Sequence, residues 1–221
     1  MPKAQRKPEE IEAIREDILD HALELIAEAG YKGFSMRKLG TRLGIAAKTI
    51  YNYFHNKDEI YLAILTRGFE TLYEKCAAAN GRNPDPMAKI AAICRTYVNF
   101  GLESANLYNL MFTWHVPKFR DYVGTEMEPV AQLELETALK VSQLFIDIIR
   151  ACANGSQTIS EDEARFLMIQ FWSQAHGYIA GINNTLLDYM HETPLIVKER
   201  LIENMLENFQ AAIQCHKRMP A

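Results

Sequence analysis

The sequence lacks several patterns that mark membrane, metal-binding or disulfide-stabilised proteins. No apolar run approaches the roughly 18–20 residues that a membrane-spanning helix needs. The four cysteines include no CxxC pair, and their spacing fits neither a zinc site nor a small disulfide framework. No apolar stretch follows the basic N-terminal residues, so we expect no signal peptide. These absences favour a cytoplasmic protein whose thiols are reduced and mostly buried.

The sequence also lacks the common enzyme motifs. It contains no HExxH, no GxSxG and no glycine-rich phosphate-binding loop. Cys94, His115 and His176 are the nearest candidates for reactive side chains, and no spacing joins them in one site. We therefore expect no enzymatic activity, no cofactor and no metal site. An all-helical enzyme or ligand carrier stays a disfavoured alternative, which turnover of a bound compound would support.

No stretch shows the apolar–polar alternation of a β-strand bounded by turn residues. Apolar residues instead recur at steps of three and four along nearly the whole chain, as Ile11, Ile14 and Ile18 illustrate. The sequence thus predicts an all-α protein. The expected helices cover about 11–29, 35–43, 46–54, 58–79, 86–104, 107–112, 119–122, 129–154, 160–190 and 194–217.

One segment lacks acidic residues altogether. The chain has a formal charge of −4, yet Tyr31–Lys57 contains six Lys or Arg residues and no Asp or Glu. Those six positive charges leave −10 on the rest of the chain. A carboxylate in this segment would be repelled by duplex DNA, which carries one phosphate charge per ~1.7 Å of its axis. The alternative is that these residues belong to a solvated pair of basic helices that packs in the fold and binds nothing. The six residues are Lys32, Arg37, Lys38, Arg42, Lys48 and Lys57.

The same segment has the pattern of a helix-turn-helix, because Gly44 separates two short predicted helices. Ile50 and Phe54 are four residues apart and should face inward, onto Leu39, Leu43 and Ile45. The opposite face then presents Ala47, Lys48, Tyr51 and Asn52, with Thr49 and Tyr53 at its sides. Lys48 can donate to guanine and Asn52 can pair with adenine in a major groove. Tyr51, Tyr53 and Lys57 suit phosphate oxygens.

The stretch GFSMRKLGTRLGIAAKTIYNYFHNKDEIYLAIL resembles the N-terminal DNA-binding region of TetR-type regulators, over roughly residues 10–65. The resemblance implies that Ala47, Lys48 and Asn52 lie near bases. It also implies that four residues contact phosphates, namely Thr49, Tyr51, Tyr53 and Lys57. Two positions depart from the family pattern. Ala46 replaces a helix-capping serine, and Gly40 stands inside a helix where alanine is common; each substitution should cost ~1 kcal/mol.

Further along the chain, Trp172, His176 and Gly177 form a W-x-x-x-H-G pattern. Together with the upstream sequence YNLMF at 108–112, it resembles the WHG-type ligand-sensing domain found behind some TetR-type N-termini. The resemblance implies a helical effector pocket and a homodimer. The alternative for each aromatic or Met residue is that it belongs to the hydrophobic core and contacts no ligand. The alternative for His176 is that it holds two helices together. We expect the effector to contact Tyr97, Phe100, Met111, Phe112, Trp114, Met168, Trp172 and His176.

Two features suit a second copy of the chain. Gly177, Ala180 and Gly181 would let another helix approach closely, and the last predicted helix has a broad apolar face. A two-fold pair of such helices would form a four-helix bundle, although packing within one chain could use the same residues.

Together these patterns predict an N-terminal three-helix helix-turn-helix domain (1–56) and a C-terminal helical ligand-binding and dimerisation domain (57–221). The expected function is that of a transcription repressor, released from a palindromic DNA operator by a small-molecule effector. The family resemblance suggests that helix 58–79 joins the effector pocket to the DNA domain and tilts. A dimeric architectural protein that binds DNA without an effector is the remaining alternative.

Overall fold

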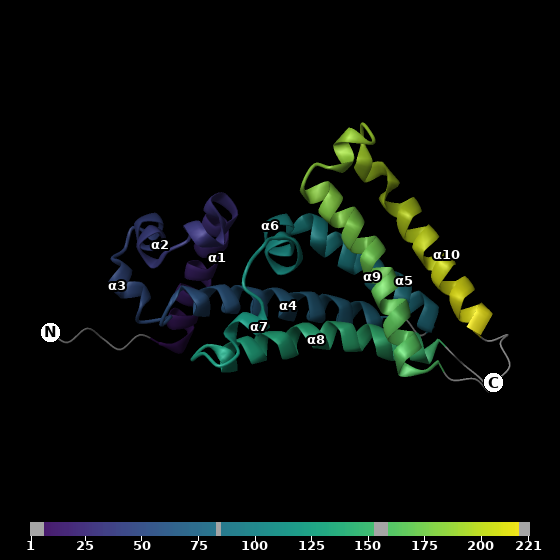
Figure 1. The fold of residues 1–221 in the computed structure, drawn as a ribbon, viewed down its shortest axis with the longest axis horizontal. Coiled ribbons are helices and arrows are strands. Elements are labelled where there is room, and N and C mark those ends of the chain that lie inside the picture. Colours follow the sequence, from purple (N-terminus) through teal and green to yellow (C-terminus); the bar gives the residue numbers. More distant parts are fainter. Residues whose placement is uncertain (1–6, 83–84, 153–158, 217–221) are drawn as a thin grey trace. The chain divides into compact units, whose positions relative to one another are not determined.

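The computed structural model of the chain describes residues 7–82, 85–152 and 159–216. Over these ranges the regular structure is helical, without strands, which confirms the predicted all-α class (Figure 1). The long helices are α1 (Pro8–Gly33), α4 (Lys57–Gly81), α5 (Pro86–Glu103), α8 (Glu128–Ala151), α9 (Glu161–Asn183) and α10 (Lys198–His216). The short elements are α2 (Met36–Leu43), α3 (Ala47–Ile50), α6 (Ala105–Tyr108), η1 (Asn109–Thr113), α7 (Phe119–Tyr122), η2 (Leu187–Tyr189) and η3 (Pro194–Val197).

The chain folds into two compact units, each made of two segments. The N-terminal unit comprises Met1–Gly68 and Leu110–Leu135, and the C-terminal unit comprises Phe69–Asn109 and Glu136–Ala221. The division falls inside α4, inside η1 and inside α8. It is a division by packing, so the functional boundary between residues 56 and 57 stays a prediction.

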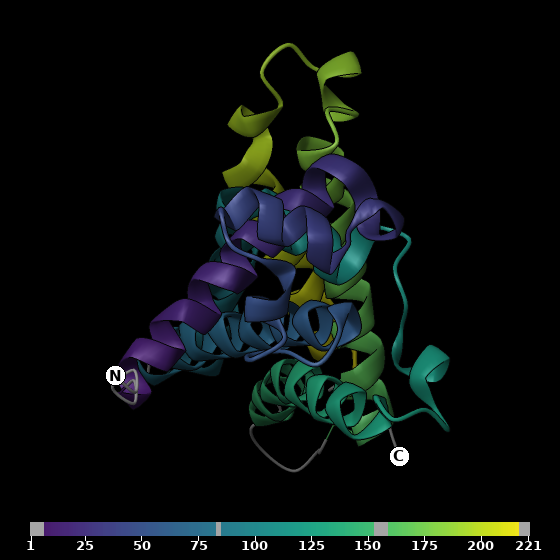
Figure 2. The ribbon, with the colours of Figure 1, turned by 90° about the vertical axis from the view of Figure 1, so that its left-hand side faces the viewer.

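In the N-terminal unit, α1 packs against α2, and α2 packs against α3 (Figure 2). Helix α1 contributes a buried apolar stripe at helical spacing. Its residues are Ile18, Leu19, Ala22, Leu25 and Ile26. Leu39 from α2, Ile50 from α3 and Phe54 beyond it are also buried. This shared core fixes α2 and α3 on α1.

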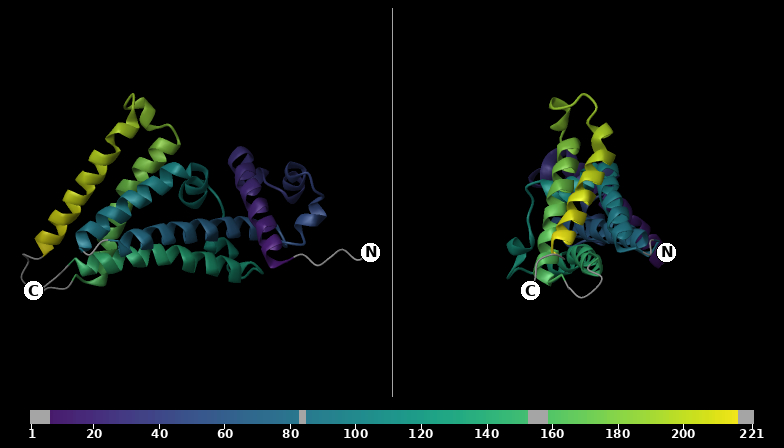
Figure 3. Two further views of the ribbon diagram at one scale, coloured as in Figure 1. Left: turned by 180° about the vertical axis from the view of Figure 1, so that it is seen from behind. Right: turned by 90° about the vertical axis from the view of Figure 1, so that its right-hand side faces the viewer.

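In the C-terminal unit, α5, α9 and α10 pack against one another (Figure 3). Gly101 permits a close approach of α5 to α9, because a Cβ at this position would lie 2.7 Å from Ile179 Cγ2. The apolar face predicted for the last helix is buried in α10, at Ile202, Met205, Phe209 and Ile213.

Side-chain caps confirm several predicted helix starts. Ser35 Oγ accepts from Lys38 N at 3.3 Å, and Asn56 Oδ1 accepts from Glu59 N at 2.8 Å. Ser160 Oγ accepts from Glu163 N at 3.2 Å. These oxygens satisfy backbone N–H groups that have no partner inside the helix.

The end of α9 differs from the prediction. The expected helix continued to about residue 190, whereas α9 ends at Asn183. Thr185 adopts a left-handed conformation with φ of 57°, and Leu186 N donates to Gly181 O at 2.8 Å. This arrangement usually needs glycine, so no residue pattern predicted it. The helix ends expected at residues 154 and 217 lie outside the described residues.

The four thiols were expected to be mostly buried, and the structure confirms this for Cys76, Cys94 and Cys152. The side chain of Cys215 lies outside the described part of the chain. Burial raises the pKa of Cys76 and of Cys94 to about 12, so both stay protonated and unreactive at neutral pH. Across the part of the chain that the structure describes, no helix is long and apolar enough to cross a membrane. The same part holds no group of His, Cys, Asp or Glu side chains that could bind a metal ion.

Candidate nucleic-acid interface and ligand-sensing cluster

The turn between α2 and α3 depends on glycine. Gly44 adopts φ of 67° and ψ of 24°, a left-handed conformation that disfavours other residues. The chain then reverses, and Ile45 N donates to Gly40 O at 2.9 Å. This sharp turn places α3 across α2, as a helix-turn-helix requires.

Gly40 has a different role from the one expected. The sequence predicted a helix weakened by glycine. In the structure, a Cβ at Gly40 would lie 2.8 Å from Ile45 O and 3.0 Å from Ala47 N. The turn and the start of α3 therefore approach α2 more closely than an alanine would allow. Gly40 supports the position of α3 rather than loosening it.

Helix α3 is shorter than predicted. It covers Ala47–Ile50 and continues as a tight turn, because Asn52 N bonds to Thr49 O (3.2 Å) and Tyr53 N to Ile50 O (2.9 Å). These i→i+3 bonds are the 3₁₀ type. As expected from Ala46, no side chain caps the start of α3.

The predicted DNA-contacting residues differ in exposure. Lys48, Tyr51 and Asn52 are exposed, and Tyr51 has 53% of its surface accessible. Ala47, Thr49, Tyr53 and Lys57 are half-buried. Ile50 and Phe54 are 0% and 1% exposed. A small polar and basic surface is thus displayed over a buried apolar base.

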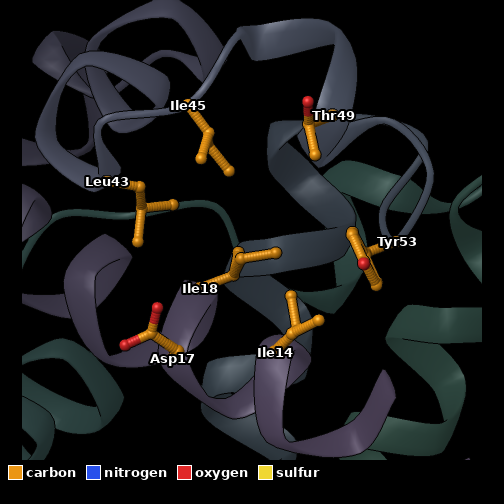
Figure 4. Close-up of a pocket in the computed structure, with 7 residues that line it drawn as sticks. All are labelled: Ile14, Asp17, Ile18, Leu43, Ile45, Thr49 and Tyr53. Carbon is orange, nitrogen blue, oxygen red and sulfur yellow. The ribbon is translucent and has the colours of Figure 1, made fainter. Parts of the chain in front are cut away.

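Ile45 is an exception to the predicted inward set. It is 36% exposed and borders a groove of about 200 Å³ between α1 and the turn. Figure 4 shows Ile18, Leu43 and Ile45 pointing into this space from different segments. Thr49 and Tyr53 line the same groove, so their inner sides are partly solvated.

Arg15 was not singled out by the sequence patterns, yet it contacts the two residues Tyr53 and Phe54 that follow α3. Its Nη1 donates to Tyr53 O, and its guanidinium lies 4.2 Å from the centre of the Phe54 ring. The bond to the carbonyl satisfies an acceptor just after α3, and the ring contact is a cation–π interaction. Helix α1 therefore fixes the C-terminal side of the displayed surface. No local motif signals this contact, because 38 residues separate the two partners.

The carboxylate-free segment of the sequence is not free of carboxylates in space. Arg42 donates to Glu28 at 2.7 and 2.8 Å and to Glu24 at 3.0 Å, both on α1. The hydrogen bond from Arg42 lowers the pKa of Glu28, as its ion pair would. Arg42 is thus engaged within the protein, whereas Lys48 remains on the exposed face.

The second segment of the N-terminal unit contacts the start of α4. Tyr61 Oη donates to Pro117 O at 2.8 Å, and Asn56 Nδ2 donates to Met127 Sδ at 3.4 Å. Tyr31 Oη donates to Asp58 on the same turn of α4. Sequence patterns missed these contacts. The first two join the start of α4 to residues 110–135, and the third joins α1 to α4.

In the C-terminal unit, three predicted effector residues belong to one polar cluster. Tyr97 Oη lies 3.1 Å from Tyr108 Oη, which lies 2.8 Å from His176 Nδ1. Trp172 stacks on His176, with ring centres 4.7 Å apart and planes 10° apart. Burial lowers the pKa of His176 and raises that of Tyr97, while a hydrogen bond from Trp172 opposes the shift at Tyr97. The cluster is a neutral hydrogen-bonded chain in a mostly apolar setting.

The other predicted effector residues are distributed as follows. Phe100 is 2% exposed and Met168 is half-buried, both in the C-terminal unit. Met111, Phe112 and Trp114 belong to the N-terminal unit, where Met111 is buried and the other two are half-buried. Tyr108, which bridges Tyr97 and His176, was missing from the predicted set. Its signal was present in the YNLMF sequence, but its partners lie too far away in the chain to be read locally.

Comparison with known proteins gives a consistent assignment. Residues 18–64 match the family described as bacterial regulatory proteins, tetR family, and residues 90–204 match the tetracyclin repressor-like C-terminal domain. The chain belongs to the TetR family. As the resemblance implied, it is a DNA-binding transcriptional regulator and not an enzyme.

The relatives of this TetR-family chain include both activators and repressors. The transcriptional activator FasR of Mycolicibacterium smegmatis is 28% identical over 163 residues, which cover 69% of this chain and 71% of FasR. The transcriptional repressor KstR of Rhodococcus jostii is 36% identical over 70 residues, or 32% of this chain and 33% of KstR.

Two solved structures share the fold. The regulatory protein SCO4313 has a TM-score of 0.72 at 19% identity, covering 92% of this chain and all of SCO4313. FadR from Bacillus subtilis, in complex with stearoyl-CoA, has a TM-score of 0.65 at 15% identity, covering 86% of this chain and 97% of FadR. At these identities, the likeness supports the fold alone.

Proposed function

We propose that this regulator is a cytoplasmic homodimeric repressor that a small-molecule effector releases from a palindromic operator. The observation that carries the DNA side is the exposed face of residues 47–54, which presents Lys48 and Asn52 above the buried Ile50 and Phe54. The proposed DNA-binding part is 1–56, and the proposed ligand-binding and dimerisation part is 57–221.

In the proposed complex, α3 enters the major groove. Lys48 donates to guanine acceptors, Asn52 pairs with adenine, and Ala47 lets the backbone approach the bases. Thr49, Tyr51, Tyr53 and Lys57 bind phosphates and set the register. Two copies read half-sites about one helical turn apart, roughly 34 Å.

The proposed effector site uses the cluster of the C-terminal unit. Its members, Tyr97, Trp172 and His176, combine aromatic surface with polar tips, as small-molecule sites usually do. Phe100 and Met168 would contribute apolar contacts, and Met111, Phe112 and Trp114 stay predicted ligand contacts. Because the FadR structure of similar fold holds stearoyl-CoA, long-chain acyl-CoA is the first class of compound to test.

The effector would act by shifting an equilibrium between two spacings of the α3 helices. It must bind the released spacing more tightly, because equal affinity for both states would shift nothing. Helix α4 is the proposed lever, since it begins beside the helix-turn-helix and continues into the C-terminal unit.

DNA binding can be tested by fluorescence anisotropy with a selected operator and a scrambled duplex at several salt concentrations. Lys48→Ala should weaken operator binding by roughly 10- to 100-fold and relax sequence preference, whereas Lys57→Ala should weaken both duplexes evenly. Lys75→Ala is the matched control, because it removes one exposed positive charge from the C-terminal unit.

Equal behaviour of Lys48→Ala and Lys57→Ala would overturn the assignment of base and phosphate contacts. A flat plot of log K against log[salt] would contradict multiple phosphate contacts. Transcription in vitro, with and without acyl-CoA, distinguishes a repressor from an activator. A repressor should lower transcription until the effector is added. Transcription that rises on adding the protein would show an activator, and indifference to every compound would favour an architectural protein.

A further inference from the structure

The basic residues around the helix-turn-helix are held in different ways. Lys38 Nζ donates to a backbone carbonyl at 2.8 Å, and Arg42 pairs with carboxylates of α1. Lys57 Nζ instead lies 4.5 Å from the centre of the Tyr31 ring. Within the described residues, no hydrogen bond or ion pair involves the Lys57 ammonium. Its three N–H donors are therefore left for another partner.

The contact between Lys57 and Tyr31 is a cation–π interaction. The face of an aromatic ring carries partial negative charge, so it attracts an ammonium within about 6 Å of its centre. An ion pair with a carboxylate would also restrain Lys57, but it would neutralise the charge and occupy N–H donors. The ring restrains the side chain and leaves both its charge and its donors for a phosphate.

Helix α1 is kinked immediately before Tyr31, whose side chain reaches the start of α4. Gly30 has φ of 69° and ψ of 163°, a combination that is essentially restricted to glycine. Beyond the kink, Tyr31 Oη donates to Asp58 in the first turn of α4, and Figure 1 shows α1 beside the beginning of α4. Burial raises the pKa of Tyr31, and the bond to Asp58 acts in the same direction. The hydroxyl therefore stays protonated and keeps its role as a donor.

A second tyrosine supports the Tyr31 ring. Tyr61, one turn after Lys57 on α4, is 0% exposed. Its ring packs edge-on against Tyr31, with ring centres 4.9 Å apart and planes 62° apart. Tyr61 is itself fixed, because its Oη donates to Pro117 O at 2.8 Å. The Tyr31 ring is thus held by its hydroxyl at one end and by Tyr61 at its side.

The bond to Asp58 also concerns the charge beside Lys57. A carboxylate that paired with Lys57 would compete directly with a DNA phosphate for the ammonium. The Asp58 carboxylate accepts from the Tyr31 hydroxyl, and it also suits the positive N-terminal end of α4. Tyr31 thus engages Lys57 with its ring face and Asp58 with its hydroxyl.

We propose that Tyr31 is a positioning residue for DNA binding, whose ring holds the Lys57 ammonium in place for a phosphate oxygen of the operator. The inference rests on the proposed phosphate contact of Lys57 and adds the residue that fixes it. A lysine side chain loses much conformational freedom when it is fixed, so a restraint that exists before DNA arrives lowers the cost of the contact. Tyr31 acts through Lys57 and not through a DNA contact of its own.

NMR of the full chain with ¹³C-labelled lysine tests the contact in the absence of DNA. Protons above the face of an aromatic ring are shifted upfield by the ring current. The Lys57 Cε protons, assigned by their loss in Lys57→Ala, should therefore resonate upfield of those of other lysines. Tyr31→Leu should return them to the ordinary position, whereas Tyr31→Phe should not. Lys57 protons at the ordinary position in the wild type would overturn the proposal.

Fluorescence anisotropy with operator DNA tests the consequence for binding. Tyr31→Leu should weaken operator binding roughly 3- to 30-fold, as expected for the loss of one cation–π contact in each of two copies. It should also reduce the slope of log K against log[salt], because the phosphate contact is weakened. Tyr31→Phe keeps the ring face and should bind within about twofold of the wild type. Tyr73→Leu is the matched control, since it makes the same change at a half-buried tyrosine of the C-terminal unit.

A double-mutant cycle separates positioning from a structural role. In the Lys57→Ala background, Tyr31→Leu should change operator binding by less than about twofold, because no ammonium remains to be positioned. An equal loss in both backgrounds, or a loss without a change in the salt slope, would show that Tyr31 only supports the fold. Circular dichroism checks that each variant is folded, and Tyr31→Met provides a second variant without a ring.

The outcomes also separate this inference from the proposed phosphate contact. If Lys57→Ala weakens binding and lowers the salt slope while Tyr31→Leu does neither, the positioning role is wrong and the phosphate contact stands. If Lys57→Ala itself has no effect, both are wrong. Lys48→Ala, measured on its own, then still decides whether residues 47–54 bind DNA.

Discussion

The helix-turn-helix and the Tyr97–Tyr108–His176 cluster are built in opposite ways. The first is assembled from neighbours in sequence, because Gly40, Gly44, Ile50 and Phe54 all fall within 15 residues. The second depends on side chains far apart, since Tyr108 and His176 are separated by 68 residues. The comparison teaches that local spacing can define a DNA-binding surface, whereas a polar cluster in a helical core exists only after α5, α6 and α9 pack.

The same contrast applies to electrostatics within the N-terminal unit. In sequence, residues 31–57 form one basic block. In space, Glu24 and Glu28 pair with Arg42, while Lys48 stays exposed. A count of charges along the chain therefore overstates the positive charge that is available to DNA.

The largest effect is expected at Gly40, where local propensity and tertiary packing disagree in sign. Propensity alone says that Gly40→Ala stabilises α2 by up to ~1 kcal/mol. The close approach of Gly40 to Ile45 O instead predicts that Gly40→Ala destabilises the protein by about 1–3 kcal/mol. Urea denaturation decides, with Thr41→Ala on the exposed side of α2 as control. A stabilised Gly40→Ala variant would mean that sequence alone governs this turn.

The next effect tests the long-range cluster. Tyr108→Phe removes the hydroxyl that bridges Tyr97 and His176 and should lower the free energy of unfolding by about 1–3 kcal/mol. Tyr189→Phe, at a residue 87% exposed, should change it by less than ~0.5 kcal/mol. If thermal and urea unfolding treat the two variants alike, the hydroxyl chain contributes nothing to stability.

A smaller effect should appear with pH. Burial lowers the pKa of His176 in the folded protein, so the unfolded chain binds a proton more readily. The stabilising contribution is fully present above about pH 6.5, the ordinary histidine pKa, and is lost as the pH falls through the lowered pKa. Wild type should therefore lose more stability than His176→Gln between pH 7.5 and pH 5.5. Parallel curves in urea denaturation would contradict this reading.

The smallest effect is expected at Arg42. Because Glu24 and Glu28 already engage it, Arg42→Gln should leave the slope of log K against log[salt] for operator binding nearly unchanged. Loss of a true phosphate contact, as expected for Lys57→Ala, should reduce that slope by ~0.9. Equal reductions in both variants would show that Arg42 leaves its acidic partners on binding DNA.

Much of the fold was predictable because helical periodicity and caps are local. Ser35, Asn56 and Ser160 cap the helices that their sequences predicted. Errors occurred at the ends of two helices and at one long-range contact. Helix α9 ends early at a left-handed Thr185, and α3 is shortened to one turn. Arg15 was overlooked, because its partners Tyr53 and Phe54 follow α3, far away in the sequence.

The sequence by itself determined the helical class, the helix-turn-helix and the family, because steps of three and four residues and a glycine turn act over short stretches. Only the tertiary structure decided that the turn after α2 packs closely on Gly40 and that Arg42 pairs with Glu24 and Glu28. It also decided that Tyr108 links Tyr97 to His176. It also left Tyr189 and Met190 exposed between α9 and α10. The physical reason is that hydrogen bonds and burial depend on distances in space, and residues far apart in the chain acquire those distances only when the helices pack.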